Sequence, residues 1–312
     1  MKLFNIQKDT LQPISRNPFK LERDIQNLIE NNVGELFDLE FVKSELTIQN
    51  FRLDTLCFDT ESKAFVIIEY KKSSSFSVID QGYTYLSLLL NNKSDFILEY
   101  NEITGKNMKR NEVDWKYSKI IFISPKFSSY QVNAINFKNV PFELWEVTRF
   151  KNNILGLNQI STDSEVDINN TFTDSSKNDK LGQVSKEVIK IDENYHLNKA
   201  KNRPEWVVEL YHELKRRILN LGDSVEHKFK KQTIGFKDRK WFADLIIYNQ
   251  GIGVVINMKK GTLDDFKNLT EDLSEKGHWG NGDYRMWLKS EENLDYTMHL
   301  IKQSYLNQVS DS

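Results

Sequence analysis

Hydrophobic residues in the first part of the chain form short strand-like runs and one-sided helical patterns. Leu53–Asp59 and Ala64–Lys71 are rich in β-branched and aromatic residues, and the polar stretch Thr60–Lys63 between them predicts a tight hairpin. On either side, Leu21–Glu30 and Val78–Leu90 repeat apolar residues at intervals of three and four, which is typical of helices with one buried face. The order helix, hairpin, helix is the centre of the predicted N-terminal fold.

Other apolar stretches in the first half also have strand character. They predict a small opening hairpin, one or two strands before the main hairpin, and three strands after it. The stretches are Lys2–Ile6, Thr10–Ile14, Glu35–Asn50, Phe96–Tyr100, Lys119–Ser124 and Phe142–Val147. The first half is therefore expected to combine strands with helices.

A polar segment separates the two halves of the chain. Ser161–Lys180 is poor in apolar residues and rich in Ser, Thr, Asn and Asp, a composition typical of linkers. At 312 residues the chain is long enough for two domains. The sequence predicts an N-terminal domain over 1–160, a polar linker over 161–195 and a smaller C-terminal α+β domain over 196–312.

The C-terminal half contains a second candidate hairpin, formed by Trp241–Tyr248 and Gly253–Lys259. A four-residue turn would pair Asp244 with Asn257, whereas the same kind of turn in the first hairpin would pair two carboxylates, Asp54 and Glu69. Because a neutral amide is a weaker ligand for a divalent metal ion than a carboxylate, we interpret the second hairpin as structural. The predicted helices on either side are Pro204–Leu221 and Leu294–Leu306.

Composition and charge narrow the class of protein. A content of 39% hydrophobic and 12% aromatic residues is typical of a globular protein. The net charge of −2 means that any contact with nucleic acid has to come from local basic patches. The single cysteine, Cys57, excludes a disulfide within the chain and favours a reducing compartment. Without a long apolar window or a signal-peptide core, we expect a cytoplasmic protein with no membrane partner.

The register of the first hairpin points to chemistry. With residues 60–63 as the turn, Asp54 lies directly opposite Glu69, and Lys71 points to the same face as Glu69 because side chains alternate along a strand. Like charges on directly paired residues are destabilising. A divalent cation between the two carboxylates would remove that penalty, so the hairpin predicts a metal site.

These residues also carry a family resemblance. The order Asp54, about a dozen residues, Glu69-x-Lys71 resembles the signature of PD-(D/E)xK nucleases, with leucine in place of the proline. Glu22 on the preceding helix and a Q-x-x-x-Y motif, Gln81 to Tyr85, on the following helix resemble the NucS-like, RecB-type branch. This resemblance covers roughly residues 15–150. The second half resembles the C-terminal domain of unknown function that accompanies this nuclease-like domain in bacterial proteins, some of which are labelled "predicted transport protein".

The resemblance implies a restriction-endonuclease-like core, in which helices flank a mixed sheet, and a Mg²⁺-dependent nuclease. Asp54 and Glu69 would hold the Mg²⁺, or Mn²⁺, with water and a phosphate oxygen as the other ligands. Lys71 would orient or deprotonate the attacking water, or stabilise developing charge. Because two neighbouring carboxylates should not lower the pKa of Lys71, the electrostatic role is favoured.

The same resemblance assigns supporting residues. Gln81 would position water or the nucleic-acid backbone, and Tyr85 would support it or stack on a base. Glu22 would complete a second metal position, although a first-turn glutamate is also favoured by the helix dipole alone. Four basic residues are candidates for phosphate contacts: Lys72, Lys106, Lys109 and Arg110.

The expected substrate is nucleic acid, with DNA favoured, in DNA repair or defence. Nucleases of this family often act as dimers, so a homodimer is also compatible with the resemblance. The alternative is a nuclease fold that binds nucleic acid or a protein partner without cleaving it. The paired carboxylates favour the enzyme, because a binding protein has no need for them.

Overall fold

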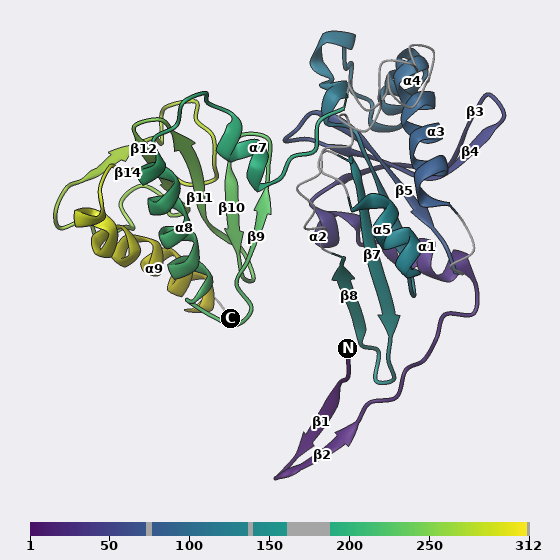
Figure 1. Cartoon of the computed structure of the whole chain (residues 1–312), viewed down its shortest axis with the longest axis horizontal. Coiled ribbons are helices and arrows are strands. Elements are labelled where there is room, and N and C mark those ends of the chain that lie inside the picture. Colours follow the sequence, from purple (N-terminus) through teal and green to yellow (C-terminus); the bar gives the residue numbers. More distant parts are fainter. Residues whose placement is uncertain (73–76, 137–139, 161–187, 311–312) are drawn as a thin grey trace. The chain divides into compact units, whose positions relative to one another are not determined.

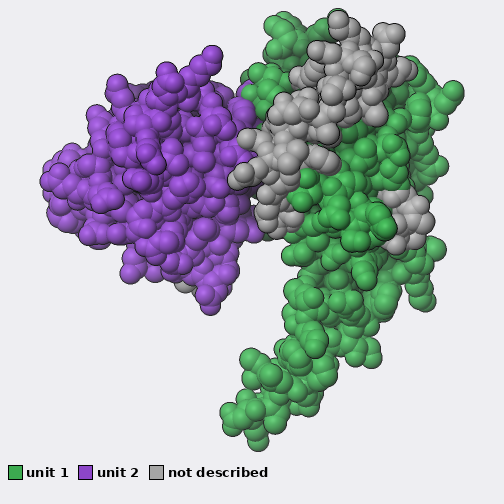
Figure 2. Space-filling model, in the orientation of Figure 1, with its two compact units in different colours: residues 1–190 green, residues 191–312 purple. Residues whose placement is uncertain are grey.

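The structure of the chain is a computed structural model that describes residues 1–72, 77–136, 140–160 and 188–310. It divides the chain into two units, residues 1–190 and residues 191–312 (Figures 1 and 2). Most of the predicted linker, 161–195, lies outside the described residues. Within the described part, no helix is both long and apolar enough to cross a membrane.

Unit 1 is built on a six-stranded mixed sheet whose strands follow one another in chain order. Strand β6 (Lys119–Ser124) pairs in parallel with β5 (Ala64–Tyr70) and with β7 (Phe142–Arg149), and the other three pairings are antiparallel. All seven residues of β5 are buried, as expected for a central strand covered on both faces. The strands are β3 (Glu40–Ile48), β4 (Phe51–Asp59), β5 (Ala64–Tyr70), β6 (Lys119–Ser124), β7 (Phe142–Arg149) and β8 (Leu155–Gln159).

Helices cover both faces of this sheet. On one face, α1 (Glu22–Glu30) and α2 (Val33–Phe37) pack against the alternate residues of β5 that include Ile68. The other face, which includes Phe65 and Ile67, belongs to a larger core. Its helices are α3 (Val78–Asn91), α4 (Lys93–Thr104) and α5 (Ser129–Ile135). The predicted mixed sheet flanked by helices is therefore confirmed.

A small antiparallel hairpin opens the chain, as the sequence predicts. It consists of β1 (Phe4–Gln7) and β2 (Thr10–Pro13), and all eight of its residues are exposed. In Figure 1 it projects away from the main sheet of unit 1. It contributes nothing to the core described here, so the site is positioned by the main sheet and its helices.

One predicted strand of unit 1 is wrong. Phe96–Tyr100 lies inside α4, where Phe96 and Tyr100 are four residues apart and both fully buried on one helix face. A short apolar run cannot distinguish a strand from one face of a helix. The helix ends at Gly105, whose φ of 68° lies in the left-handed region that favours glycine as a terminator.

Unit 2 combines a six-stranded antiparallel sheet with helices, which confirms the predicted α+β domain. The strands are β9 (Glu226–Phe229), β10 (Ile234–Lys237), β11 (Trp241–Tyr248), β12 (Gly251–Ile256), β13 (Thr270–Asp272) and β14 (Tyr284–Leu288). The helices are α7 (Glu193–Asn198), α8 (Glu205–Leu219) and α9 (Leu294–Ser310). The strand order is β13-β14-β12-β11-β10-β9, and α8 and α9 pack their apolar residues against one face of the sheet.

The predicted register of the β11–β12 hairpin is also wrong. Tyr248 pairs with Gly251 across a two-residue loop, so Asp244 faces Val255 instead of Asn257. Gly251 explains the difference, because its φ of 135° and its approach to the backbone of β14 exclude a side chain. A Cβ there would lie 2.4 Å from the carbonyl oxygen of Leu288. The glycine therefore begins a strand where the sequence pattern suggests a turn.

Candidate active site

The β4–β5 hairpin has the predicted register. Asp59 pairs with Ala64 and Thr55 with Ile68, and continuing this ladder by one residue brings Asp54 opposite Glu69. At that point the Oδ2 atom of Asp54 accepts a hydrogen bond of 2.9 Å from the backbone N–H of Tyr70. The two predicted metal-binding carboxylates therefore meet at one end of the hairpin.

Glu69 is the most deeply buried of the predicted site residues, with only 2% of its surface exposed. Its Oε1 atom accepts hydrogen bonds of 2.6 Å from Lys71 Nζ and of 2.6 Å from Gln81 Nε2. Its Oε2 atom is buried and has no hydrogen-bond partner in the described part of the chain. Burial, with the charge of Asp54, raises the pKa of Glu69 to about 7.

Asp54 and Lys71 complete a small charged group around Glu69. Burial raises the pKa of Asp54, although the hydrogen bond from Tyr70 and the charge of Lys71 oppose the shift. Burial by itself would lower the pKa of Lys71, but its hydrogen bond to Glu69 and the surrounding carboxylates outweigh that effect and raise it. Lys71 is therefore held as a cation, and the electrostatic role expected from the sequence stays a prediction.

The helix α3 brings Gln81 and Tyr85 to the same place. Gln81 Nε2 lies 2.9 Å from the Tyr85 hydroxyl, which in turn reaches the carbonyl oxygen of Arg52 at 3.3 Å. The helix can approach the sheet closely because residue 82 is glycine: a Cβ there would lie 2.6 Å from the ring of Phe142. Both residues of the Q-x-x-x-Y motif are thus tied to the hairpin that carries the carboxylates.

Glu22, at the start of α1, also reaches this region. Its Oε2 atom accepts a hydrogen bond of 2.6 Å from the backbone N–H of Lys72, and its charge contributes to the raised pKa of Asp54. The ammonium group of Lys72 donates to the carbonyl oxygen of Lys20. Glu22 and Lys72 therefore border the carboxylate pair, and the roles predicted for them stay predictions.

The structure does not bring the basic loop residues to the carboxylates. Lys106 is paired with Glu40 at 2.7 Å, and Glu40 faces Phe58 on β4. Phe58 lies four residues along the strand from Asp54, which corresponds to about 13 Å. The neighbouring Lys109 and Arg110 belong to the same loop, at the start of the short 3₁₀ helix Arg110–Glu112. Phosphate binding by these three residues stays a prediction.

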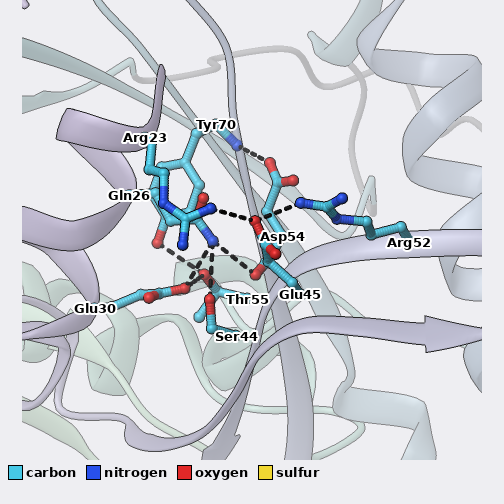
Figure 3. Close-up of polar contacts among 9 residues, drawn as sticks. All are labelled: Arg23, Gln26, Glu30, Ser44, Glu45, Arg52, Asp54, Thr55 and Tyr70. Carbon is cyan, nitrogen blue, oxygen red and sulfur yellow. Dashed lines mark hydrogen bonds and ion pairs between the residues drawn. The ribbon is translucent and has the colours of Figure 1, made fainter. Parts of the chain in front are cut away.

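A buried polar network on the α1 side of the hairpin was missed by the sequence analysis (Figure 3). The side-chain N–H groups of Gln26 lie 3.1 Å from the carbonyl oxygen of Asp54 and 3.0 Å from Glu30, which also accepts a hydrogen bond of 2.6 Å from Thr55. Thr55 in turn reaches the hydroxyl of Tyr70 at 3.1 Å. This network holds the backbone of β4 at Asp54 and the side chain of Tyr70 on β5, next to the carboxylates. The only signal in the sequence was a glutamine beside the buried stripe of α1.

Two arginines on the same side were also missed. Arg23 of α1 and Arg52 of β4 reach the carboxylate of Glu45 from opposite sides (Figure 3). Glu45 itself has a φ of 54°, a conformation that a glutamate rarely adopts within a strand. Glu45 is thus paired with both guanidinium groups at the surface of unit 1.

The carboxylate pair offers few protein ligands to a metal ion. In the described residues, no three His, Cys, Asp or Glu side chains cluster closely enough to hold a metal between them. Mg²⁺, however, is commonly held by one or two carboxylates, with water and phosphate oxygens as its remaining ligands. The unpartnered Oε2 atom of Glu69, next to Asp54, is a buried oxygen donor of that kind. The pair therefore fits a hydrated Mg²⁺ and does not fit an all-protein cage.

Comparisons with solved structures give only remote likenesses. An EndoMS–dsDNA2 complex matches with 15% identity over 42% of this chain and 47% of that chain, at a TM-score of 0.29. Pyrococcus furiosus SfsA in complex with Ca²⁺ matches with 15% identity over 52% of this chain and 77% of that chain, at a TM-score of 0.26. Scores this low carry no argument about function.

Sequence comparisons reach further across the chain. Residues 197–308, within unit 2, match a family described as a domain of unknown function, DUF5655. A protein of Haemophilus influenzae, described as uncharacterized, is 44% identical over 304 residues, which cover 97% of this chain and 99% of the relative. Because the identity is high and extends through both units, the chain belongs to the same family as this Haemophilus influenzae protein.

Proposed function

We propose that unit 1 is a divalent-metal-dependent nuclease that hydrolyses phosphodiester bonds of DNA. The observation that supports this most directly is the buried, unpartnered Oε2 atom of Glu69 beside Asp54. Burying a carboxylate oxygen without a partner is costly, and a ligand that satisfies it explains why the arrangement is tolerated. The neighbouring Lys71 and Gln81 match the remaining residues of the nuclease motif by position and by contact.

The residues divide into ligands and positioning groups. Asp54 and Glu69 would hold the ion, and Mg²⁺ held there would supply a more acidic bound water and neutralise phosphate charge. Lys71 remains protonated and stabilises negative charge developing on the phosphate. Gln81 fixes the orientation of the Glu69 carboxylate, and Tyr85 fixes Gln81.

The alternative, a fold that binds nucleic acid without cutting it, requires no paired carboxylates. It would leave the cost of bringing Asp54 and Glu69 together without a compensating role. A hairpin that served only to bind could carry apolar or amide side chains at these two positions. The metal-dependent enzyme is therefore the function that the geometry supports best.

The test is a cleavage assay with the purified full-length protein on labelled single-stranded, duplex and branched DNA, in Mg²⁺, Mn²⁺ or EDTA. We expect cleavage only with a divalent metal, and its loss in Asp54→Asn and Glu69→Gln. Glu99→Gln is the matched control, because Glu99 is an ion-paired glutamate of unit 1 on α4 that bonds to Lys43. Cleavage that persists in EDTA, or that survives Glu69→Gln, would contradict the proposal and favour the binding protein.

A further inference from the structure

The second face of the unit 2 sheet, opposite α8 and α9, has a composition unlike an ordinary solvent-exposed surface. Cross-strand pairing aligns Ile246, Gly253 and Trp287 in one row. Tyr248 and Arg285 lie in the adjacent rows, and the Tyr248 and Trp287 rings are 5.0 Å apart. The guanidinium group of Arg285 lies 4.8 Å from the centre of the Trp287 ring. Two aromatic rings and one guanidinium group thus lie together on β11 and β14, with Gly253 of β12 between the two strands.

Glycines create the space on this face. A Cβ at residue 253 would lie 3.2 Å from the Tyr248 ring and 3.8 Å from the Arg285 side chain, so both side chains fold over the bare backbone. The loop 277–283 is also held against the sheet by glycines. A Cβ at Gly280 would lie 2.9 Å from Val255, and one at Gly282 would collide with the backbone of Ile256. This loop holds Trp279 at the rim, where 55% of its surface is exposed.

Two adjoining pockets result, and Tyr248 lines both. The first, of about 400 Å³, lies between Tyr248 and Trp287 and is also lined by Asn249, Gln250 and Lys289. The second, of about 520 Å³, is also lined by Lys276, His278, Trp279 and Arg285. We call these two the pocket pair. Each has the volume of a small-molecule site and combines flat aromatic walls with a few polar groups.

The charges on the pocket pair define the class of ligand. Among the residues that line it, three are cationic and none is a carboxylate. Two of these cations, Lys276 and Arg285, are paired with Glu271 of β13, and the third, Lys289, lines the first pocket. The lining itself therefore offers no anion to a cationic ligand such as a methylated lysine. Aromatic faces next to Lys and Arg are the combination that binds nucleobases by stacking while cations contact the adjoining phosphates. The amides of Asn249 and Gln250 can in addition hydrogen-bond the edge of a base.

We propose that the pocket pair binds two consecutive nucleobases of one nucleic-acid strand. Two pockets on either side of one tyrosine match a strand, in which bases follow one another, better than they match a single nucleotide. Paired bases of a duplex do not present their faces, so the site selects single-stranded or unpaired segments. This goes beyond the proposed hydrolysis and does not depend on the carboxylate pair of unit 1.

The experiment uses the full-length protein with Asp54→Asn, in EDTA, so that cleavage cannot interfere. Tryptophan fluorescence is titrated with a short oligothymidylate, with the corresponding duplex and with thymidine monophosphate. We expect saturable quenching with the oligothymidylate and much weaker binding of the other two. Trp279→Ala should weaken binding roughly 5- to 150-fold, the range for one stacked base. Lys289→Ala should lower the log–log salt slope by about 0.7.

Trp206→Ala is the matched control, because Trp206 is a tryptophan of unit 2 on α8 that is 42% exposed and does not line the pocket pair. It should retain both affinity and quenching. Thermal unfolding of each variant checks that it folds. Lys289→Ala tests the same site without removing an aromatic side chain. Equal affinities of Trp279→Ala and Trp206→Ala would overturn the proposal, as would equal binding of duplex or of the mononucleotide. This binding experiment does not depend on the cleavage assay, and its result stands even if the protein does not cleave DNA.

Discussion

Replacing Glu69 with glutamine should stabilise the metal-free protein. Burial and the charge of Asp54 raise the pKa of Glu69 from 4.5 to about 7. The folded state therefore binds more protons than the unfolded state between these pH values, and wild-type stability falls as the pH rises through this window. The shift corresponds to about 3 kcal/mol. Because glutamine makes a weaker hydrogen bond with Lys71, we expect a net gain of about 1–3 kcal/mol at pH 8.

The same substitution should abolish the response to metal. A ligand present at 100 times its dissociation constant stabilises the state that binds it by about 2.7 kcal/mol. Saturating Mg²⁺ should therefore stabilise the wild type by an amount of this order and leave Glu69→Gln unchanged. In EDTA the variant should therefore be the more stable protein. In Mg²⁺ the two proteins should be about equally stable, or the wild type should be the more stable one.

The assay is urea unfolding at pH 5.5 and pH 8, with EDTA or Mg²⁺, and the midpoint of the unit 1 transition is compared. Glu99→Gln controls for loss of a glutamate; as Glu99 belongs to a partly exposed ion pair, the change should stay within about 1 kcal/mol. The reasoning is refuted by a Glu69→Gln protein that is less stable than the wild type at pH 8 in EDTA. Equal stabilisation of both proteins by Mg²⁺ would refute the assignment of the metal ligand.

Three further predictions concern other parts of the chain. Gly82→Ala would place a Cβ 2.6 Å from the ring of Phe142, so it should cost about 1–3 kcal/mol in urea unfolding and lower cleavage as well. Burial lowers the pKa of His196 to about 4, so unit 2 should lose up to about 3 kcal/mol as the pH falls from 6.5 to 4, and His196→Phe should lose less. Lys109→Ala with Arg110→Ala should lower the salt slope of DNA binding by about 1–2 and preserve the cleavage rate at saturating DNA.

The main hairpin could be predicted because its information is local. The polar turn Thr60–Lys63 between Leu53–Asp59 and Ala64–Tyr70 sets the register, and a slip by one residue would turn every side chain to the other face. The pairing of Asp54 with Glu69 followed from that register. The contact of Gln81 with Glu69 could be expected only through the motif, because α3 reaches the hairpin through tertiary packing.

The features that were missed depend on contacts between distant segments. Gln26 became a site-supporting residue because α1 packs against β4, which no local pattern encodes. Gly251 begins a strand because the backbone of β14 lies close to it. Since glycine usually indicates a turn, the sequence pattern placed the turn of the second hairpin too far along the chain. The apolar run from Phe96 to Tyr100 is compatible with a helix as well as with a strand. Its secondary structure is decided by the core that packs around it.

The parallel centre of the unit 1 sheet has a consequence for the order of folding. β4 and β5 are joined by a short turn, so the two carboxylates can meet early, before any distant segment has docked. β5 can pair with β6 only after the whole chain between Tyr70 and Lys119 has been looped back, which is a slow, non-local step. Gln81 and Tyr85 lie within that looped segment. We therefore expect refolding to form the carboxylate pair first and to complete its surroundings only when the crossover closes.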